Sequence, residues 1–123
     1  MKIISTLLVL IVILIHVFIL ILEMFFWNHP IGLKSFSMTP EDAKASTILA
    51  MNQGLYNGFL AAGLCWGLLT KRHSVILFFL ACVITAGIFG AITAKPSILI
   101  VQALPAVIAL IAVQLSSRSN TNC

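Results

Sequence analysis

The sequence has 123 residues, of which 61% are hydrophobic and only 8% are charged, and its mean hydropathy is +1.16. A soluble domain carries about 25% charged residues, so this composition excludes a water-exposed globular protein and indicates a chain that resides mainly in lipid. The formal net charge of +4 comes from seven Lys and Arg scattered at the ends of apolar segments, which excludes a continuous basic stripe for nucleic acid.

The first apolar run covers residues 3–27 and follows a single lysine, Lys2. It is longer than the 7–15 residues of a signal-peptide core, and no A-x-A cleavage site follows it. We therefore predict a retained transmembrane helix, with Trp27 at the membrane interface, where amphipathic rings collect.

The polar connection 28–46 leads into the second helix. Pro30 and Gly32 predict turns. Thr39 is suited to cap a helix whose first residue is Pro40, and the acidic residues after it favour the positive end of the helix dipole. The membrane part of this helix is predicted to cover residues 47–69.

The third and fourth apolar runs cover residues 75–94 and 97–115, with polar turns before each and a kink predicted at Pro105. Each run approaches the roughly 20 residues that cross a bilayer, and none alternates as a barrel strand would. Short turns permit only antiparallel neighbours. The sequence therefore predicts an all-α, polytopic membrane protein, an antiparallel bundle of four transmembrane helices in a single domain, 1–123.

The basic residues predict the orientation of this bundle. One side of the membrane receives Lys2, Lys71, Arg72 and Arg118, and the other receives Lys34, Lys44 and Lys95. Lys71 and Arg72 are adjacent in a very short turn, and this pair makes the first side the more basic one. By the positive-inside rule we predict a multi-pass protein with both termini in the cytoplasm.

Several polar side chains interrupt these apolar runs at similar heights. Seven residues advance a helix by about 700°, so His16 and Glu23 share one face of the first helix. We expect Glu23 to face inward, either protonated or paired with Gln102, Asn52 or Gln53. The predicted site, for a ligand or a proton relay, comprises His16, Glu23, Asn52, Gln53, Tyr56, Asn57 and Gln102.

Two interpretations of these residues stay open. They line a polar pocket that binds or moves a small solute or a proton, or they only fix helix packing, at about 0.6 kcal/mol per interhelical hydrogen bond. Four helices are few for transport, so the first interpretation predicts a homodimer.

A membrane enzyme acting on a lipid-like substrate is a weaker alternative, because no nucleophile elbow, HExxH or phosphate loop occurs. An accessory subunit of a larger membrane complex is the other. The three cysteines have no metal-ligand spacing, so neither a metal nor a cofactor is expected.

Four blocks of sequence resemble one known family. They are HVFILILEMFFW (16–27), AMNQGLYNGFLAAGLCWG (50–67), GIFGA (87–91) and VQALPAVIAL (101–110). Together they are similar to the small bacterial membrane proteins catalogued as domain of unknown function 1304. The resemblance implies a polytopic protein of the bacterial inner (plasma) membrane, and it implies no activity, substrate or catalytic residue.

Overall fold

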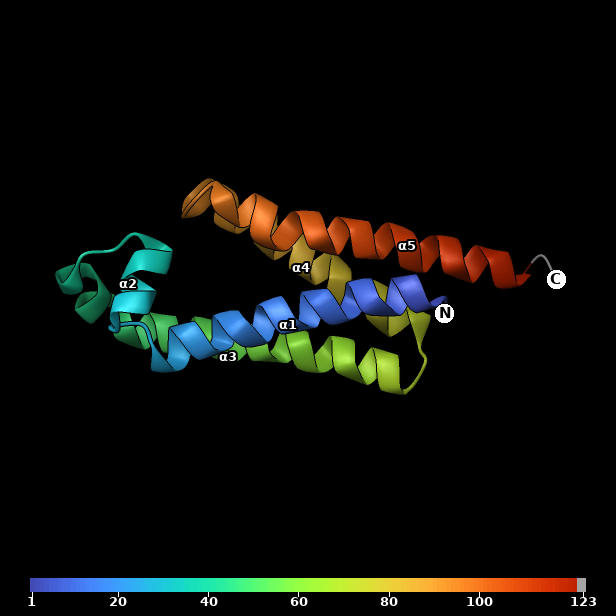
Figure 1. The fold of residues 1–123 in the computed structure, drawn as a ribbon, viewed down its shortest axis with the longest axis horizontal. Coiled ribbons are helices and arrows are strands. Elements are labelled where there is room, and N and C mark those ends of the chain that lie inside the picture. The colour runs from blue at the N-terminus through green and yellow to red at the C-terminus, as the bar shows by residue number, and fades with distance from the viewer. Residues whose placement is uncertain (122–123) are drawn as a thin grey trace. The chain divides into compact units, whose positions relative to one another are not determined.

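The computed structural model describes residues 1–121, with side chains to residue 118 (Figure 1). Every regular element in this part of the chain is helical, which confirms the all-α prediction. The elements are α1 (Ile3–Phe25), α2 (Pro30–Phe36), α3 (Pro40–Leu69), α4 (His73–Thr93), the π-helical turn η1 (Leu99–Ala103) and α5 (Leu104–Thr121).

Three helical stretches within the described residues are long and apolar enough to cross a membrane: Ile3–Phe25, His73–Thr93 and Leu99–Arg118. The length and composition of these helices indicate a membrane protein. The remaining predicted span, 47–69, lies within α3. This helix has 30 residues, but it is not among the three, because Asn52, Gln53 and Asn57 lower its hydropathy.

The chain divides into two compact units. Unit 1 comprises residues 1–15 and 60–121 of the described chain, and unit 2 comprises residues 16–59. Both unit boundaries fall inside helices, one within α1 and one within α3. Unit 1 contains α4, η1 and α5, and unit 2 contains α2.

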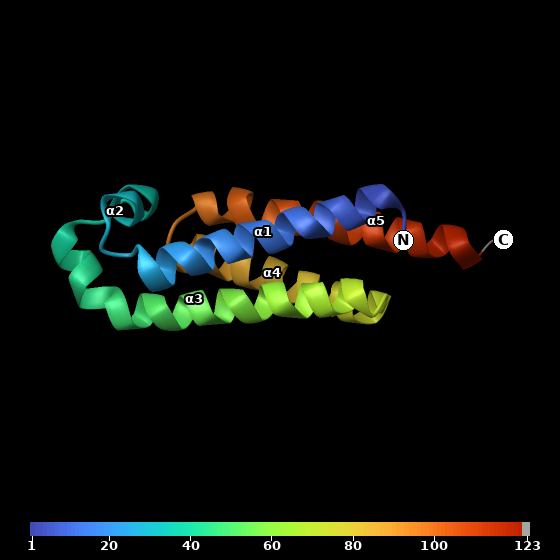
Figure 2. The same cartoon turned by 60° about the horizontal axis from the view of Figure 1, so that its bottom comes forward.

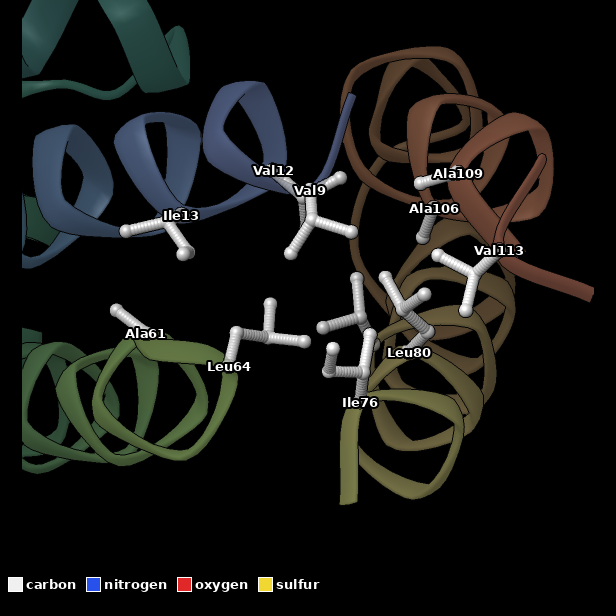
Figure 3. Close-up of a cluster of buried hydrophobic side chains, with 11 residues drawn as sticks. Val9, Val12, Ile13, Ala61, Leu64, Ile76, Leu80, Ala106, Ala109 and Val113 are labelled. Carbon is white, nitrogen blue, oxygen red and sulfur yellow. The ribbon is translucent and has the colours of Figure 1, made fainter. Parts of the chain in front are cut away.

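The core of unit 1 receives side chains from all four of its long helices (Figure 3). Leu64, Ile76 and Leu80 are its largest fully buried residues. The whole cluster consists of Val9, Val12, Ile13, Ala61, Leu64, Ile76, Leu80, Val83, Ala106, Ala109 and Val113. In this cluster α5 contributes two alanines, Ala106 and Ala109, whose small side chains allow α5 to pack closely against α4.

Glycines set the closest approaches within unit 1. A Cβ at Gly87 would lie 2.9 Å from the backbone nitrogen of Ala103 and 3.0 Å from its Cβ. Backbone atoms cannot move away as a side-chain tip can. Gly87 is therefore the point at which α4 and η1 touch main chain to main chain.

The connection between α3 and α4 is a tight helix ending. The N–H of Arg72 donates to the carbonyl of Gly67 (3.0 Å), and that of Lys71 donates to the carbonyl of Leu68 (3.2 Å). These two bonds form a Schellman motif, which places Lys71 in the left-handed region with φ of 54°. Glycine is the residue usually found at this position, so a lysine here is an exception.

The predicted kink at Pro105 takes the form of the π-helical turn η1. The N–H of Leu104 donates to the carbonyl of Leu99, five residues back instead of four. Proline has no N–H, and its ring would clash with the carbonyl four residues earlier in a regular α-helix. The wider turn relieves that clash immediately before the proline.

Unit 2 corrects the prediction of turns at Pro30 and Gly32, because residues 30–36 form the short helix α2 (Figure 2). His29 caps it, with Nδ1 accepting from the N–H of Ile31 at 3.3 Å, and Pro30 takes the first position. Gly32 lies so close to the carbonyls of Phe26 and Trp27 that no Cβ fits there. Glycine thus serves close packing here and not a turn.

The start of α3 confirms the prediction for Thr39 and Pro40. The helix begins at Pro40, and the N–H of Asp42 donates to Oγ1 of Thr39 at 3.2 Å. The threonine hydroxyl in turn donates to Oδ2 of Asp42 at 2.8 Å. This reciprocal cap fixes the first turn of the helix.

Candidate functional site

The buried face of α1 follows a regular three-and-four spacing. Its buried positions include Ser5, Val9, Val12, His16, Ile19 and Glu23. This spacing keeps one side of a helix turned toward its neighbours, since the helix repeats every 3.6 residues. His16 has no exposed surface and Glu23 has 9%, so both polar residues lie on the packed side of α1.

The facing stripe of α3 in unit 2 consists of small or polar residues with the same spacing. Ala43, Ala50 and Gly54 are buried, and Thr47 and Asn57 are partly buried. Small residues allow neighbouring helix backbones to approach closely. This stripe allows α3 to pack closely against α1 although its amide residues lower its hydropathy.

Gly54 brings α3 directly against the part of α1 that carries Glu23. A Cβ at Gly54 would lie 2.6 Å from Cγ of Met24, 3.1 Å from Cβ of Glu23 and 3.2 Å from the carbonyl oxygen of Leu20. Glu23 therefore has the backbone of α3 beside it. The next polar residue along the same stripe of α3 is Asn57.

Asn57 and Glu23 form the polar contact at the centre of unit 2. Nδ2 of Asn57 donates to Oε2 of Glu23 at 2.9 Å. The same nitrogen also donates to the carbonyl oxygen of Gln53, one turn earlier in α3, at 3.0 Å. With both amide hydrogens engaged, the Asn57 side chain is held in the orientation that serves the glutamate.

The partner of Glu23 differs from the residues predicted for it, which were Gln102, Asn52 and Gln53. The axial rise along each helix, counted from Trp27 for the first and from Thr47 for the second, predicts that Asn57 lies deeper in the membrane than Glu23. However, α1 ends at Phe25, and the contact at Gly54 sets the register of the two helices locally. A helix-by-helix depth count does not contain that information.

The other predicted site residues occupy different positions. Asn52, Gln53 and Tyr56 are exposed on α3, and within the described chain none of their side chains forms a hydrogen bond; the Tyr56 ring lies 6.1 Å from that of Phe59. Gln102 belongs to unit 1, where it is partly buried in η1. Of the seven predicted residues, the structure directly bonds the side chains of Glu23 and Asn57.

Two side-chain hydrogen bonds join α3 to the residues that follow α1. Nε1 of Trp27 donates to Oγ of Ser46 at 3.1 Å, and Nδ2 of Asn28 donates to Oγ1 of Thr47 at 3.0 Å. Sequence reasoning missed both. The available signal was weak: a tryptophan and an asparagine end one apolar run, and two hydroxyl residues begin the next.

This arrangement limits the chemistry of the site. The Glu23 carboxyl group is buried, and its hydrogen-bond partner is a neutral amide. No three His, Cys, Asp or Glu side chains gather into a possible metal site among the residues described. The carboxyl group is suited to holding a proton, or to accepting a donor group of a small polar ligand.

Comparison with known proteins identifies a family for this chain but no activity. The sequence profile of the family described as "Protein of unknown function (DUF1304)" matches residues 10–114. The "Uncharacterized protein YpaA" of Lactococcus lactis subsp. lactis (strain IL1403) is 29% identical over 115 residues, covering 90% of this chain and 97% of that protein. No solved structure matches the chain.

Proposed function

Because the chain belongs to the DUF1304 family, whose description assigns no activity, we propose a function from the geometry of its own site. We propose a four-span membrane protein in which Glu23 takes up and releases a proton, or binds the donor group of a small solute, between α1 and α3. The observation that carries this proposal is the buried Glu23 carboxyl with Asn57 as its partner.

The length and packing of α3 support a fourth span. Its 30 residues exceed the roughly 20 needed to cross a bilayer. Its small-residue stripe suits close packing against another helix within the membrane. In unit 1 its residues Ala61 and Leu64 belong to the same core as residues of the three apolar helices.

Contacts within each unit support the proposal that neighbouring helices are antiparallel. Along each of the three helix pairs that glycine contacts define, the residue number rises on one helix as it falls on the other. The contacts are Gly54 with Glu23 and Gly58 with Leu20 in unit 2, and Gly63 with Phe79, Gly67 with Ile76, Gly87 with Ala103 and Gly90 with Ile98 in unit 1.

The physical chemistry of a carboxyl group in lipid supports the proton-binding role. An ionised carboxylate within a membrane span is costly unless it is paired or hydrated, and such residues commonly serve proton or ion pathways. Asn57 donates one hydrogen bond to Glu23 but brings no positive charge. Glu23 is therefore suited to being protonated when the site is dry and ionised when water enters.

His16 is suited to be a second proton-binding residue of the same pathway. It is fully buried on the packed face of α1, two turns from Glu23. The two residues are separated by about 10 Å of helix rise, which is too far for a direct proton transfer. The proposal therefore requires water between them.

We place the protein in the bacterial plasma membrane with both termini in the cytoplasm. The adjacent basic residues Lys71 and Arg72 in the short turn between α3 and α4 support this orientation. The Lactococcus relative supports a bacterial setting.

Proton flux in liposomes tests the proposal. The purified chain is reconstituted with a pH-sensitive dye inside, and an acid pulse is applied outside. We expect flux above that of protein-free liposomes, and we expect Glu23→Gln, which keeps the shape but cannot ionise, to abolish the excess. Thr93→Val, a change at an exposed residue of α4 outside the predicted site, should retain it.

Equal flux for the Glu23→Gln variant and the unmutated protein would reject the proton role of this residue. A solute role is tested in the same liposomes by adding a library of small amines, amides and alcohols and measuring Glu23-dependent uptake.

Exposed amides on α3 support a second candidate, in which the protein associates with another copy of itself. Asn52 and Gln53 each carry donors and acceptors, so two identical faces can satisfy one another across a two-fold axis. Mass measurement in mild detergent tests this. A homodimer that Gln53→Leu converts to monomer is expected, and a monomeric unmutated protein would exclude it.

A further inference from the structure

A cavity of about 240 Å³ lies in unit 1, beside the turn between α3 and α4. We call it the turn pocket. Its lining consists of Met1, Thr6, Leu68, Lys71, His73 and Ile76. It is several times larger than the ~30 Å³ that one water occupies in the liquid, so it has room for a polar group of several atoms.

The charge around the turn pocket is positive, and no acidic side chain belongs to the same unit. Lys71 lines the cavity and Arg72 follows it directly. The sequence contains three acidic residues, Glu23, Glu41 and Asp42, and all of them belong to unit 2. An anion from outside the chain is therefore the natural partner of these cations.

His73 adds a polar atom that lacks a partner. Nε2 of its ring is shielded from solvent and forms no hydrogen bond within the described part of the chain. A buried polar atom without a partner costs free energy, so such an atom calls for an explanation, for which an absent ligand is one of the standard possibilities. His73 lines the cavity, where a bound acceptor or donor would satisfy it.

The backbone conformation of Lys71 also supports a ligand-binding role for the turn pocket. Its φ of 54° is a conformation in which an L-residue is strained, whereas glycine would adopt it freely. A lysine nevertheless occupies this left-handed position, at the wall of the pocket. A strained residue at a cavity motivates a functional hypothesis, since glycine would serve the turn better.

We propose that the turn pocket binds the phosphate group of an anionic phospholipid headgroup. Lys71 supplies the charge, and Nε2 of His73 supplies a hydrogen-bonding atom. Leu68 and Ile76 give the pocket an apolar wall, which suits the region where a lipid headgroup meets its acyl chains. Basic pockets between membrane helices are known to bind such headgroups. This site is separate from the Glu23 site and does not depend on the proton role.

Native mass spectrometry of the full-length protein tests this proposal. The delipidated protein in mild detergent is mixed with equal amounts of phosphatidylglycerol and phosphatidylcholine, and the retained lipids are counted. We expect the anionic lipid to be preferred. Lys71→Gly should reduce that preference about five-fold, the effect of removing one lysine near a membrane surface, and His73→Leu should also reduce it.

The choice of Lys71→Gly separates binding from folding. Glycine is favoured at the left-handed position, so the variant keeps the turn while losing the charge. Lys44→Gln removes a charge of the same sign from an exposed position in unit 2 and should leave the preference unchanged. An equal loss in both lysine variants would reject a specific pocket.

Competition with inorganic phosphate distinguishes binding of a lipid headgroup phosphate from binding of a free phosphate ion. If millimolar phosphate displaces phosphatidylglycerol from the unmutated protein but not from Lys71→Gly, the pocket takes phosphate groups in general, including a free one. If it displaces none, the membrane-anchored headgroup is the ligand. Lys71→Gly with an undiminished preference for phosphatidylglycerol would overturn the proposal.

Discussion

Asn57 and Glu23 are 34 positions apart in the sequence, yet Nδ2 of Asn57 donates a 2.9 Å hydrogen bond to Oε2 of Glu23. The contact joins the C-terminal part of α1 to the middle of α3. It also relates the two unusual features of these helices, a carboxyl group within a membrane-length apolar run and an amide in a stripe of small residues. Four substitution experiments test the packing around this contact and elsewhere in the chain.

The first prediction concerns the hydrogen bond itself. Asn57→Leu removes the donor and leaves the buried carboxyl without its amide partner, so we expect the free energy of unfolding to fall by about 1 kcal/mol, within the range for interhelical bonds in membranes. SDS titration of the purified protein, at a dilution where it is monomeric, measures this. Asn52→Leu makes the same chemical change at an exposed position and should alter stability by less than about 0.5 kcal/mol. Equal effects of the two variants would contradict the assignment.

The second prediction contrasts two glycines on α3. A Cβ at Gly54 would approach the carbonyl oxygen of Leu20 and Cβ of Glu23, whereas a Cβ at Gly58 would meet chiefly the flexible Cδ1 of Leu20. We expect Gly54→Ala to destabilise unit 2 by about 1–3 kcal/mol through overpacking. Gly58→Ala should be neutral or stabilising, because alanine favours a helix and Leu20 can rotate away. The same SDS titration compares them, and the reverse order would show that the α1–α3 packing is misassigned.

The third prediction applies the same contrast to unit 1. Gly87 faces the backbone of Ala103, and Gly90 faces side-chain atoms of Ile98, the nearest at 3.3 Å. Gly87→Ala should therefore cost about 1–3 kcal/mol, and Gly90→Ala much less. Thermal aggregation in detergent, followed by size-exclusion chromatography, measures the loss of stability in both variants. A tolerated Gly87→Ala would mean that α4 and η1 lie further apart than the structure has them.

The fourth prediction concerns the strained lysine. Lys71→Gly relieves the left-handed conformation and should raise the free energy of unfolding by about 1 kcal/mol. Lys71→Ala removes the same charge but keeps a Cβ, so it should give no such gain. If both variants behave alike, the conformation at residue 71 contributes nothing measurable, and the charge alone accounts for any change.

Much of the fold could be predicted from the sequence because apolar length and helix-capping residues are local signals. The first helix was predicted from Ile3 and begins there, and the capped start at Thr39 and Pro40 is observed directly. Helix α2 was missed because Pro30 and Gly32 are typical of turns as well. The close approach of Gly32 to the carbonyls of Phe26 and Trp27, which leaves no room for a Cβ, is a tertiary feature that a local pattern does not contain.

The candidate site was predictable in part. The 700° rotation between His16 and Glu23 correctly placed both on one face, which is buried. The identity of the glutamate's partner was not predictable from depth alone, because it depends on the register set by Gly54. The three-and-four spacing of small residues that includes Asn57 is the sequence signal that would have favoured this residue over Asn52 and Gln53.

The two tryptophans give this protein a pair of intrinsic fluorescent reporters. Trp27 donates its indole N–H to Ser46 and lies 4.7 Å, centroid to centroid, from the Phe36 ring, so its emission follows the integrity of the α1–α2–α3 hairpin. Trp66 is 52% exposed on α3 and is accessible to quenchers carried on brominated acyl chains. Single-tryptophan variants therefore allow hairpin opening and lipid contact to be recorded separately, with no attached dye.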